Sequence, residues 1–190
     1  MNATAAYSTQ NELLLNNLMD FYKNEAYLTK MLKIITGESK ISLRIVDWFA
    51  TNYAKKNYTL YPITDVNGNN IRFKVYFDYK LKLKAYSKKR FDPFCRWERI
   101  SIPYKNGTCI ETTIGQLNFF KWALENKVVD YIENNYEVIE NDMNNRNSTS
   151  KRKESANGDN AKTRKKREEL SISATKSIKK EEVEIVVQFH

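Results

Sequence analysis

The sequence has little of what most enzyme active sites require: one histidine, two cysteines and five glycines in 190 residues. The histidine is His190, the last residue given, so acid, base or triad chemistry based on histidine is not expected. Cys95 and Cys109 lack the paired spacing of a zinc site, and no glycine-rich phosphate loop or dinucleotide motif is present. The sequence therefore predicts a non-enzymatic protein with no cofactor and no metal ion.

Signal segments and long apolar runs are missing as well. The N-terminus has no charged and then apolar segment followed by a cleavage site. No apolar run approaches the roughly 20 residues that a membrane helix needs. Since cysteine is also rare, we expect an intracellular protein of a reducing compartment, the cytoplasm or the nucleus, with no membrane partner.

What is present indicates a folded domain with a different C-terminal part. The residues are 41% hydrophobic and 13% aromatic, which is typical of a globular chain, and the length suits one domain with tails. After residue 145 the apolar periodicity gives way to Asn, Ser, Lys and Arg. We predict an α+β domain over 1–145, a disordered basic linker over 146–168, and a C-terminal β segment over 169–190 that packs on the domain.

The net charge of +9 is unevenly distributed along the chain. Residues 71–105 contain eleven Lys and Arg against three acids, a net charge of +8. Residues 106–145 contain two Lys against seven acids, a net charge of −5, and residues 146–180 contain twelve Lys and Arg against four acids, again +8. Clustered positive charge favours anionic partners, such as nucleic acid or an acidic protein surface.

The longest alternation of apolar and polar residues is IRFKVYFDYKLKLKAY, from Ile71 to Tyr86. Alternation with a period of two predicts a strand. One face of this strand would carry apolar side chains toward a core, and the other would carry Lys80, Lys82 and Lys84. Two Asn-Gly pairs, at 67–68 and 106–107, are hairpin signals, so an antiparallel meander containing this strand is the expected topology.

Helical patterns flank the predicted sheet on both sides. Thr9 with Glu12 and Thr113 with Gln116 form capping-box patterns. The helical segment Lys127–Met143 is acidic, and the predicted sheet is rich in Lys. This segment could dock on the sheet, which would explain both charge clusters without a ligand. Helices are expected at Gln10–Lys23, Glu25–Ile35, Ser42–Lys55, from Thr113 onward, and at Lys127–Met143 with a break near Asn134-Asn135; the other strands are expected at Tyr58–Ile63, Trp97–Pro103 and Thr108–Thr112.

Two further alternating segments follow the predicted linker. Leu170, Ile172 and Ala174 alternate with polar residues, and apolar residues alternate again over 183–189. A strand that is apolar on one side is not expected to remain in water. A C-terminal strand or hairpin is therefore predicted to return to the sheet.

Basic residues alternate with aromatic ones from the predicted central strand to its C-terminal flank. Sites for single-stranded nucleic acid combine a positive groove with aromatic rings on which bases stack. Lysines that guard a strand against aggregation, with the aromatics in the core, explain the same pattern without a ligand. The residues predicted to bind nucleic acid, single-stranded or double-stranded, are Arg72, Lys74, Lys80, Lys82, Lys84, Lys88, Lys89, Arg90, Phe91, Arg96, Trp97 and Arg99.

Three segments carry a resemblance to a known group of proteins: ISLRIVDWFATNYAKKN, YKLKLKAYSKKRFDPFCRWERI and TTIGQLNFFKWALENKVVDYIENN. They resemble segments of short, uncharacterised proteins from nucleocytoplasmic large DNA viruses, over about Ile41 to Met143. The resemblance implies a viral protein made in an infected eukaryotic cell, either a virion component or a factor acting on viral DNA. It transfers no active-site residues.

Two functions from different classes follow. The first is a non-enzymatic, viral, nucleic-acid-binding protein that uses the basic strand face. The alternative is a structural or interaction protein, such as a minor virion component, whose basic face binds an acidic protein partner. Lys151-Arg152 and the basic residues 164–167 also fit a two-part nuclear import signal or an ordinary basic linker. The oligomeric state is not predicted.

Overall fold

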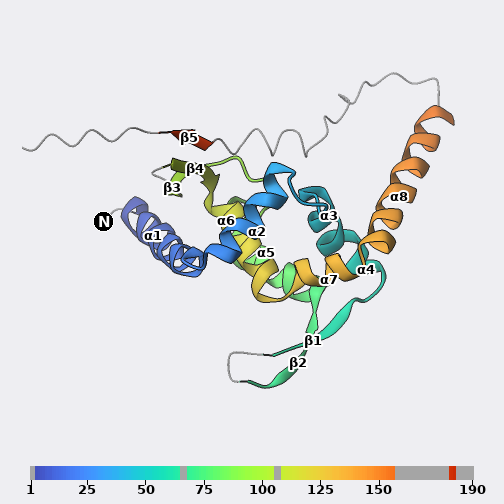
Figure 1. Cartoon of the computed structure of the whole chain (residues 1–190), viewed down its shortest axis with the longest axis horizontal. Helices are drawn as coiled ribbons and strands as arrows, with labels where there is room; N and C mark the ends of the chain where they lie inside the picture. Colours follow the sequence, from blue (N-terminus) through green and yellow to red (C-terminus); the bar gives the residue numbers. More distant parts are fainter. Residues whose placement is uncertain (1–2, 65–67, 105–107, 157–179, 183–190) are drawn as a thin grey trace, which may run out of the picture.

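The computed structural model describes residues 3–64, 68–104, 108–156 and 180–182, and the side chains within 10–64, 68–104 and 109–146 (Figure 1). Helices dominate, and short strands form two separate antiparallel sheets, which confirms the α+β class. The elements are α1 (Ala3–Tyr22), α2 (Glu25–Thr36), α3 (Leu43–Trp48), the π-helical segment η1 (Phe49–Tyr53), α4 (Ala54–Lys56), β1 (Leu60–Thr64), β2 (Asn70–Lys74), α5 (Val75–Arg90), β3 (Arg99–Pro103), β4 (Thr108–Thr113), α6 (Ile114–Glu125), α7 (Val128–Asn134), α8 (Tyr136–Ala156) and β5 (Lys180–Glu182).

Local capping signals determine the ends of α2 and the start of α3. The Asn24 side chain accepts a hydrogen bond from the backbone N–H of Ala26 at 3.0 Å, in front of α2. Gly37 then ends α2 in the left-handed conformation, with φ of 80°, which glycine adopts without steric cost. Ser42 accepts a hydrogen bond from the N–H of Ile45 at 3.3 Å and caps α3, as predicted.

Two N-terminal helices differ in detail from the prediction. α1 begins at Ala3, so the predicted start at the Thr9 capping box is wrong; the alanines upstream of Thr9 favour helix strongly enough to extend it. The helix predicted from Ser42 is present, but it contains the π-helical segment η1 between α3 and α4. Phe49 and Ala50 in this segment are fully buried.

The predicted central strand from Ile71 to Tyr86 is wrong beyond its first residues. β2 ends at Lys74, and α5 takes over from Val75. Val75 and Tyr79 are buried, and Tyr86 packs half-buried against the core. Apolar residues therefore also recur at helical spacing here. Because Lys and Leu are strong helix formers, the tertiary packing selects the helix from a pattern that suits both structures.

The two predicted hairpins are present, but they do not share one sheet. β1 pairs with β2 in antiparallel register, with Ile63 opposite Ile71, and β3 pairs with β4, with Ile102 opposite Ile110. α5 lies between the hairpins in the chain, so the single meander predicted from the sequence is wrong. Each hairpin instead contributes its apolar face separately to the core.

Three residues within the predicted C-terminal β segment, 180–182, join the sheet of β3 and β4. β5 pairs antiparallel with β4, residues 180–182 lying opposite 108–110. This agrees with the predicted return of a C-terminal strand. The apolar alternations at 170–174 and 183–189 lie outside the described residues.

The disordered linker predicted from residue 146 is wrong in its first part. α8 continues to Ala156, and Figure 1 shows it extending away from the other helices. Extending an existing helix needs no new nucleus, so a polar sequence without an apolar face continues it. Lys151-Arg152 lies in this helix, whereas residues 157–168, including the second basic cluster, lie outside the described residues.

α6 is the centre of the core. Every residue from Ile114 to Phe120 is buried, so α6 is surrounded on all sides. The Tyr22 hydroxyl donates a hydrogen bond to the backbone oxygen of Leu117 at 2.8 Å and joins α1 to α6. Thr113 accepts a hydrogen bond from the N–H of Gln116 at 3.2 Å and caps the helix, as predicted.

The acidic residues of α7 and α8 bind lysines of other helices, not a basic sheet. Lys30 of α2 lies 2.6 Å from an Asp130 oxygen and 3.1 Å from a Glu133 oxygen. Lys56 of α4 lies 2.5 Å from an Asp142 oxygen. These ion pairs therefore do not support the alternative in which the acidic helical segment docks on the central basic stretch.

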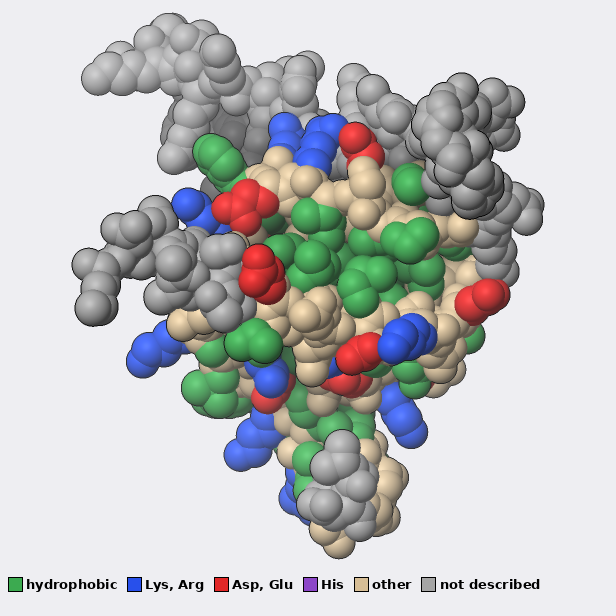
Figure 2. All heavy atoms as spheres, turned by 90° about the vertical axis from the view of Figure 1, so that its left-hand side faces the viewer, with side chains coloured by type: hydrophobic (Ala, Val, Ile, Leu, Met, Phe, Trp, Pro, Cys, Tyr) green, Lys and Arg blue, Asp and Glu red, His purple; other side chains and the backbone are tan. Residues whose placement is uncertain are grey.

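α1 forms the outer layer on one side of the molecule (Figure 1). Figure 2 looks at this side and shows hydrophobic side chains gathered in its centre, with Lys or Arg and Asp or Glu side chains around them. Leu13 of α1 is 66% exposed. Because charges of both signs surround the apolar area, this side has no clear preference for an anionic ligand.

Candidate nucleic-acid interface

Residues 87–98, which comprise the end of α5 from its kink at Ser87 and the segment up to β3, are called the basic loop here. It starts at Ser87, whose φ of 61° and ψ of 168° interrupt the helical conformation of α5. Such a conformation persists only where the surrounding structure determines it. Phe91, Pro93 and Cys95 are buried, whereas Arg96, Trp97 and Glu98 are exposed. The basic loop therefore has an inner side that packs on the core and an outer side that faces solvent.

Buried polar side chains of α6 bind the backbone of the basic loop. Gln116 is completely buried and donates from Nε2 to the backbone oxygen of Pro93 at 3.0 Å. Asn118 is 6% exposed and donates from Nδ2 to the backbone oxygen of Arg90 at 2.8 Å. A buried amide left without a partner is destabilising, so these hydrogen bonds hold the loop in one conformation.

Thr112 and Asp92 complete this anchoring. The Thr112 hydroxyl donates to Oε1 of Gln116 at 3.2 Å and so orients the amide that binds the loop. The Asp92 N–H donates to the backbone oxygen of Gly115 at 3.3 Å, and the Asp92 carboxylate accepts the N–H of Phe94 at 2.8 Å. The loop is thus bound to α6 through its backbone, which leaves its outer side chains available.

Gly115 allows α6 to approach the basic loop closely. A Cβ atom at this position would lie 2.8 Å from the Cβ of Cys95 and 3.0 Å from the backbone oxygen of Lys89. The Cys95 thiol donates to that same oxygen at 3.4 Å. Glycine is needed here because of close packing, not because of an unusual φ.

Burial raises the pKa of Asp92 above its ordinary value of 3.8. The N–H of Phe94 and the positive charge of Lys88 act in the opposite direction and offset part of this effect. Holding the charged form of Asp92 in a half-buried position is therefore unfavourable. We infer that the carboxyl serves the turn at residues 92–94, not a ligand.

The outer side of the loop combines cations with one aromatic ring. Lys88, Lys89 and Arg96 are exposed, and Trp97 is 69% exposed, which is high for so large an apolar side chain. The Nζ of Lys89 lies 5.9 Å from the centre of the Trp97 ring, within the range of a cation–π contact. A planar ring beside exposed cations is the arrangement that binds an unstacked base and its phosphates.

The structure brings only some of the predicted residues together. Lys88, Lys89, Arg96 and Trp97 lie on the outer side of the basic loop, with Arg90 half-buried at its inner edge. Phe91 is 1% exposed and packs against Phe119 and Trp122, so its predicted role in base stacking is wrong. Its place in the core follows from the register of the loop, which the sequence does not reveal.

The remaining predicted cations are dispersed. Arg72 and Lys74 are exposed on the β1–β2 hairpin. Lys80, Lys82 and Lys84 lie on α5 and not on a strand, so the predicted common basic face does not form; Lys80 and Lys84 are exposed and Lys82 is half-buried. A helix turns by about 100° per residue, so residues two apart point in nearly opposite directions.

Arg99 and Asp78 have partners in the structure. The Arg99 guanidinium lies 3.3 Å from a Glu111 oxygen across the β3–β4 hairpin, a partly exposed ion pair. Asp78 accepts a hydrogen bond from Nε1 of Trp122 at 2.6 Å. Neither residue therefore belongs to the open surface of the basic loop.

Sequence reasoning missed Gln116 and Asn118 as the residues that position the loop. Gln116 was interpreted only as part of a capping box, although its side chain binds Pro93 and Thr112. The available signal was the presence of two amides among the apolar residues of LNFFKWAL and its N-terminal flank. Amides inside a fully apolar helix indicate buried hydrogen bonds.

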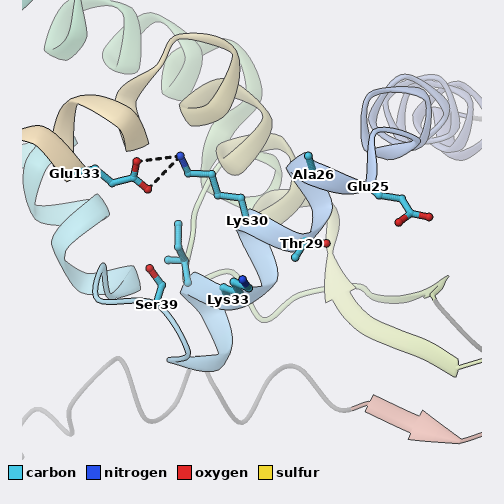
Figure 3. A pocket seen from close by; sticks show the side chains of 8 residues that line it. Glu25, Ala26, Thr29, Lys30, Lys33, Ser39 and Glu133 are labelled. Carbon is cyan, nitrogen blue, oxygen red and sulfur yellow. Dashed lines mark hydrogen bonds and ion pairs between the residues drawn. The ribbon is translucent and has the colours of Figure 1, made fainter.

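A concave region lies between α2 and α7, away from the residues predicted to bind nucleic acid. It is an open pocket of about 500 Å³ whose lining is largely charged or polar, and Figure 3 shows Lys30 and Glu133 pointing toward each other in it. Lys30 already binds Asp130 and Glu133. These contacts join the two helices.

The described residues also bear on metal binding and on membrane insertion. In those residues, no group of three or more His, Cys, Asp or Glu side chains is placed to hold a metal ion. Within the same ranges, no helix combines the length and the apolar character needed to cross a membrane. Cys95 and Cys109 are both free thiols.

Comparison with known proteins places the chain among proteins without an assigned function. The model of a family described as "Family of unknown function (DUF7197)" matches residues 2–178. An uncharacterized protein, L507, of Acanthamoeba polyphaga mimivirus is 46% identical over 148 residues, which are 75% of this chain and 56% of that relative. The chain thus spans little more than half the length of this relative. No solved structure matches. The resemblance to uncharacterised giant-virus proteins is confirmed.

Proposed function

The chain belongs to the DUF7197 family of unknown function, and we propose that it is a non-enzymatic protein that binds single-stranded nucleic acid through the outer side of the basic loop. The observation that carries the proposal is the exposed Trp97 ring with Lys89 beside it, on a backbone that α6 holds in place. An ordered loop loses little conformational entropy on binding. The ring would stack on a base, and Lys88, Lys89 and Arg96 would bind phosphates.

A single strand fits this surface better than a duplex. Stacking on Trp97 needs a base whose face is free, and in a duplex both faces of each base are covered. The cations that surround the ring supply the sequence-independent attraction to the backbone. The similarity of this chain to a mimivirus protein is consistent with a role in an infected cell. The two free thiols, Cys95 and Cys109, suit a reducing compartment of that cell.

The test measures the affinity of a labelled single-stranded oligonucleotide by fluorescence anisotropy at several salt concentrations. Replacing Lys88 and Lys89 together by Ala should weaken binding and reduce the slope of log K against log salt by up to about 1.4, since each phosphate contact on a single strand contributes about 0.7. Trp97→Ala should weaken binding by roughly 5-fold to 100-fold at every salt concentration and leave the slope unchanged.

The matched control removes two exposed lysines elsewhere. Lys23→Ala with Lys33→Ala changes the net charge by the same amount, at the end of α1 and on α2, and should have little effect on binding. Equal losses in both double variants would show that only net charge matters and would reject the basic loop as the site. Absence of binding to single-stranded and double-stranded oligonucleotides at about 50 mM salt would reject the proposed function itself.

A further inference from the structure

α5 has a solvent face that carries large apolar side chains. Val75 and Tyr79 point into the core, with exposures of 0% and 9%. On the opposite side Phe77 is 60% exposed and Leu81 is 66% exposed, and Ala85 is also exposed. Spacing by four residues places Phe77, Leu81 and Ala85 in one row along the helix, about 12 Å long.

A row of cations runs beside this apolar row. Lys80 and Lys84 are exposed and also lie four residues apart, so they follow the same direction along α5. No described residue forms an ion pair with either lysine, in contrast to Lys30 and Lys56, which bind acids of α7 and α8. The solvent face of α5 therefore presents an apolar row and an unneutralised positive row side by side.

We propose that the solvent face of α5 is a docking surface for an acidic amphipathic helix of a partner protein. Apolar residues of such a helix, spaced by three and four, would cover Phe77 and Leu81, and its Asp or Glu side chains would meet Lys80 and Lys84. Charge complementarity selects an acidic partner over a basic one. Nucleic acid fits this face less well than an apolar helix does, because Phe77 is the one ring in the row, while Leu81 and Ala85 are aliphatic. This face lies on α5 upstream of Ser87, where the basic loop begins.

The test uses a synthetic peptide as the probe, because the natural partner is unidentified. The peptide is a labelled amphipathic helix of about 18 residues with Leu on one face and Glu beside it; a peptide of the same composition in scrambled order is the control. The whole protein should bind the ordered peptide and not the scrambled one, measured by fluorescence anisotropy. Leu81→Asp should weaken this binding at least about tenfold.

Two variants control for folding and for general exposure. Leu13 of α1 has the same exposure as Leu81, 66%, so Leu13→Asp is the matched substitution and should leave peptide affinity unchanged. Lys80→Glu with Lys84→Glu should lose the Glu peptide and bind a peptide in which Lys replaces Glu, which an unfolded protein would not do. Far-UV circular dichroism checks that every variant keeps its helices.

Three results would overturn the proposal. The first is no peptide binding, and the second is an equal loss with Leu13→Asp and Leu81→Asp. The third is that vesicles containing phosphatidylserine bind the protein through Leu81 while the peptide does not, which would make the face a lipid-binding surface. Oligonucleotide affinity is measured on Leu81→Asp and Leu13→Asp and should be the same in both, since each substitution adds one negative charge and neither residue lies in the basic loop.

Discussion

At the scale of single residues, burial separates two aromatic side chains that the sequence treats alike. Phe91 and Trp97 both lie among Lys and Arg, yet Phe91 is 1% exposed and Trp97 is 69% exposed. Phe91 fills space between Tyr79 and Phe119. The ring of Trp97 contributes little to the core, which leaves it free for recognition.

The first prediction follows from this contrast. Phe91→Ala should lower the free energy of unfolding by about 3 to 5 kcal/mol, because it leaves a cavity in the core. Trp97→Ala should change it by less than about 0.5 kcal/mol, because the side chain is mostly exposed. Urea denaturation measures both. Similar losses in the two variants would mean that Trp97 also belongs to the packed core.

The second prediction concerns the pH dependence contributed by Asp92. Because its pKa in the folded protein is raised above 3.8, the folded state binds more protons than the unfolded state between 3.8 and the raised pKa. The stability contributed by this group is therefore greatest at low pH and falls as the pH rises through that window. Asp92→Asn removes the charge but keeps an oxygen that can accept the N–H of Phe94.

Asp92→Asn should consequently be more stable than the unmodified protein at about pH 7, and the difference should shrink toward about pH 4. Urea denaturation at both pH values measures this. Asp92→Ala is the control, since it removes the charge and the acceptor together and should be less stable than Asp92→Asn throughout. A difference between the Asn variant and the unmodified protein that does not vary with pH would contradict the assignment.

At the scale of elements, α5 is the clearest difference between prediction and structure. Its sequence alternates with a period of two, but Val75, Tyr79 and Tyr86 also fit a helical stripe. As a helix it packs on α6, where Nε1 of Trp122 donates to Asp78. In a strand, its lysines would lie on one face and most of its apolar residues on the other. The helix therefore leaves Phe77 and Leu81 in solvent.

The third prediction tests the helical state of α5 at Lys84, an exposed position. In a helix Lys84→Thr should be less stable than Lys84→Ala by up to about 0.7 kcal/mol, because a β-branched side chain loses rotamer freedom. In a strand the order should reverse, since Thr fits a pleated surface better than Ala. Urea denaturation of the two variants decides the sign. A more stable Thr variant would favour the strand.

At the scale of the whole molecule, charge and chain connectivity determine which surfaces stay available. The acids of α7 and α8 neutralise Lys30 and Lys56, which joins the C-terminal helices to the N-terminal ones. The cations of α5 and the basic loop lie outside these pairs. In the part of the chain whose side chains the structure describes, five exposed cations therefore lie between residues 80 and 97: Lys80, Lys84, Lys88, Lys89 and Arg96.

The fourth prediction concerns the return of the chain after α8. β5 pairs with β4 over 180–182, so a chain ending at Ala156 loses this strand. We expect that truncated chain to have a lower free energy of unfolding than the full chain, because edge hydrogen bonds of β4 become exposed to water. Deleting residues 157–168 instead should have a small effect, since loop closure depends only on the logarithm of loop length. Equal stability of the truncated and full chains would contradict a stabilising role for β5.

The candidate site was predictable only in part. Lys88, Lys89, Arg96 and Trp97 stand out in the sequence as cations close to an aromatic residue, and they do share one surface. The anchoring by Gln116 and Asn118 was not predicted, because it joins the loop to a helix that begins more than ten residues later. Such contacts depend on tertiary packing and leave only a weak local signal.

The sequence by itself determined the features that a few neighbouring residues control. Asn24, Gly37, Ser42 and Thr113 delimit their helices because the caps depend on residues within one turn. The hairpins at 60–74 and 99–113 follow from short loops between alternating segments.

Tertiary structure alone decided the conformation of residues 75–90 and the orientation of the basic loop. The alternating pattern of Leu and Lys suits both a strand and a helix, so the better packing against α6 selects the helix. The burial of Phe91 and the exposure of Trp97 depend on where α6 binds the loop backbone. These outcomes are set by contacts between residues far apart in the chain, whose free energies no local pattern contains.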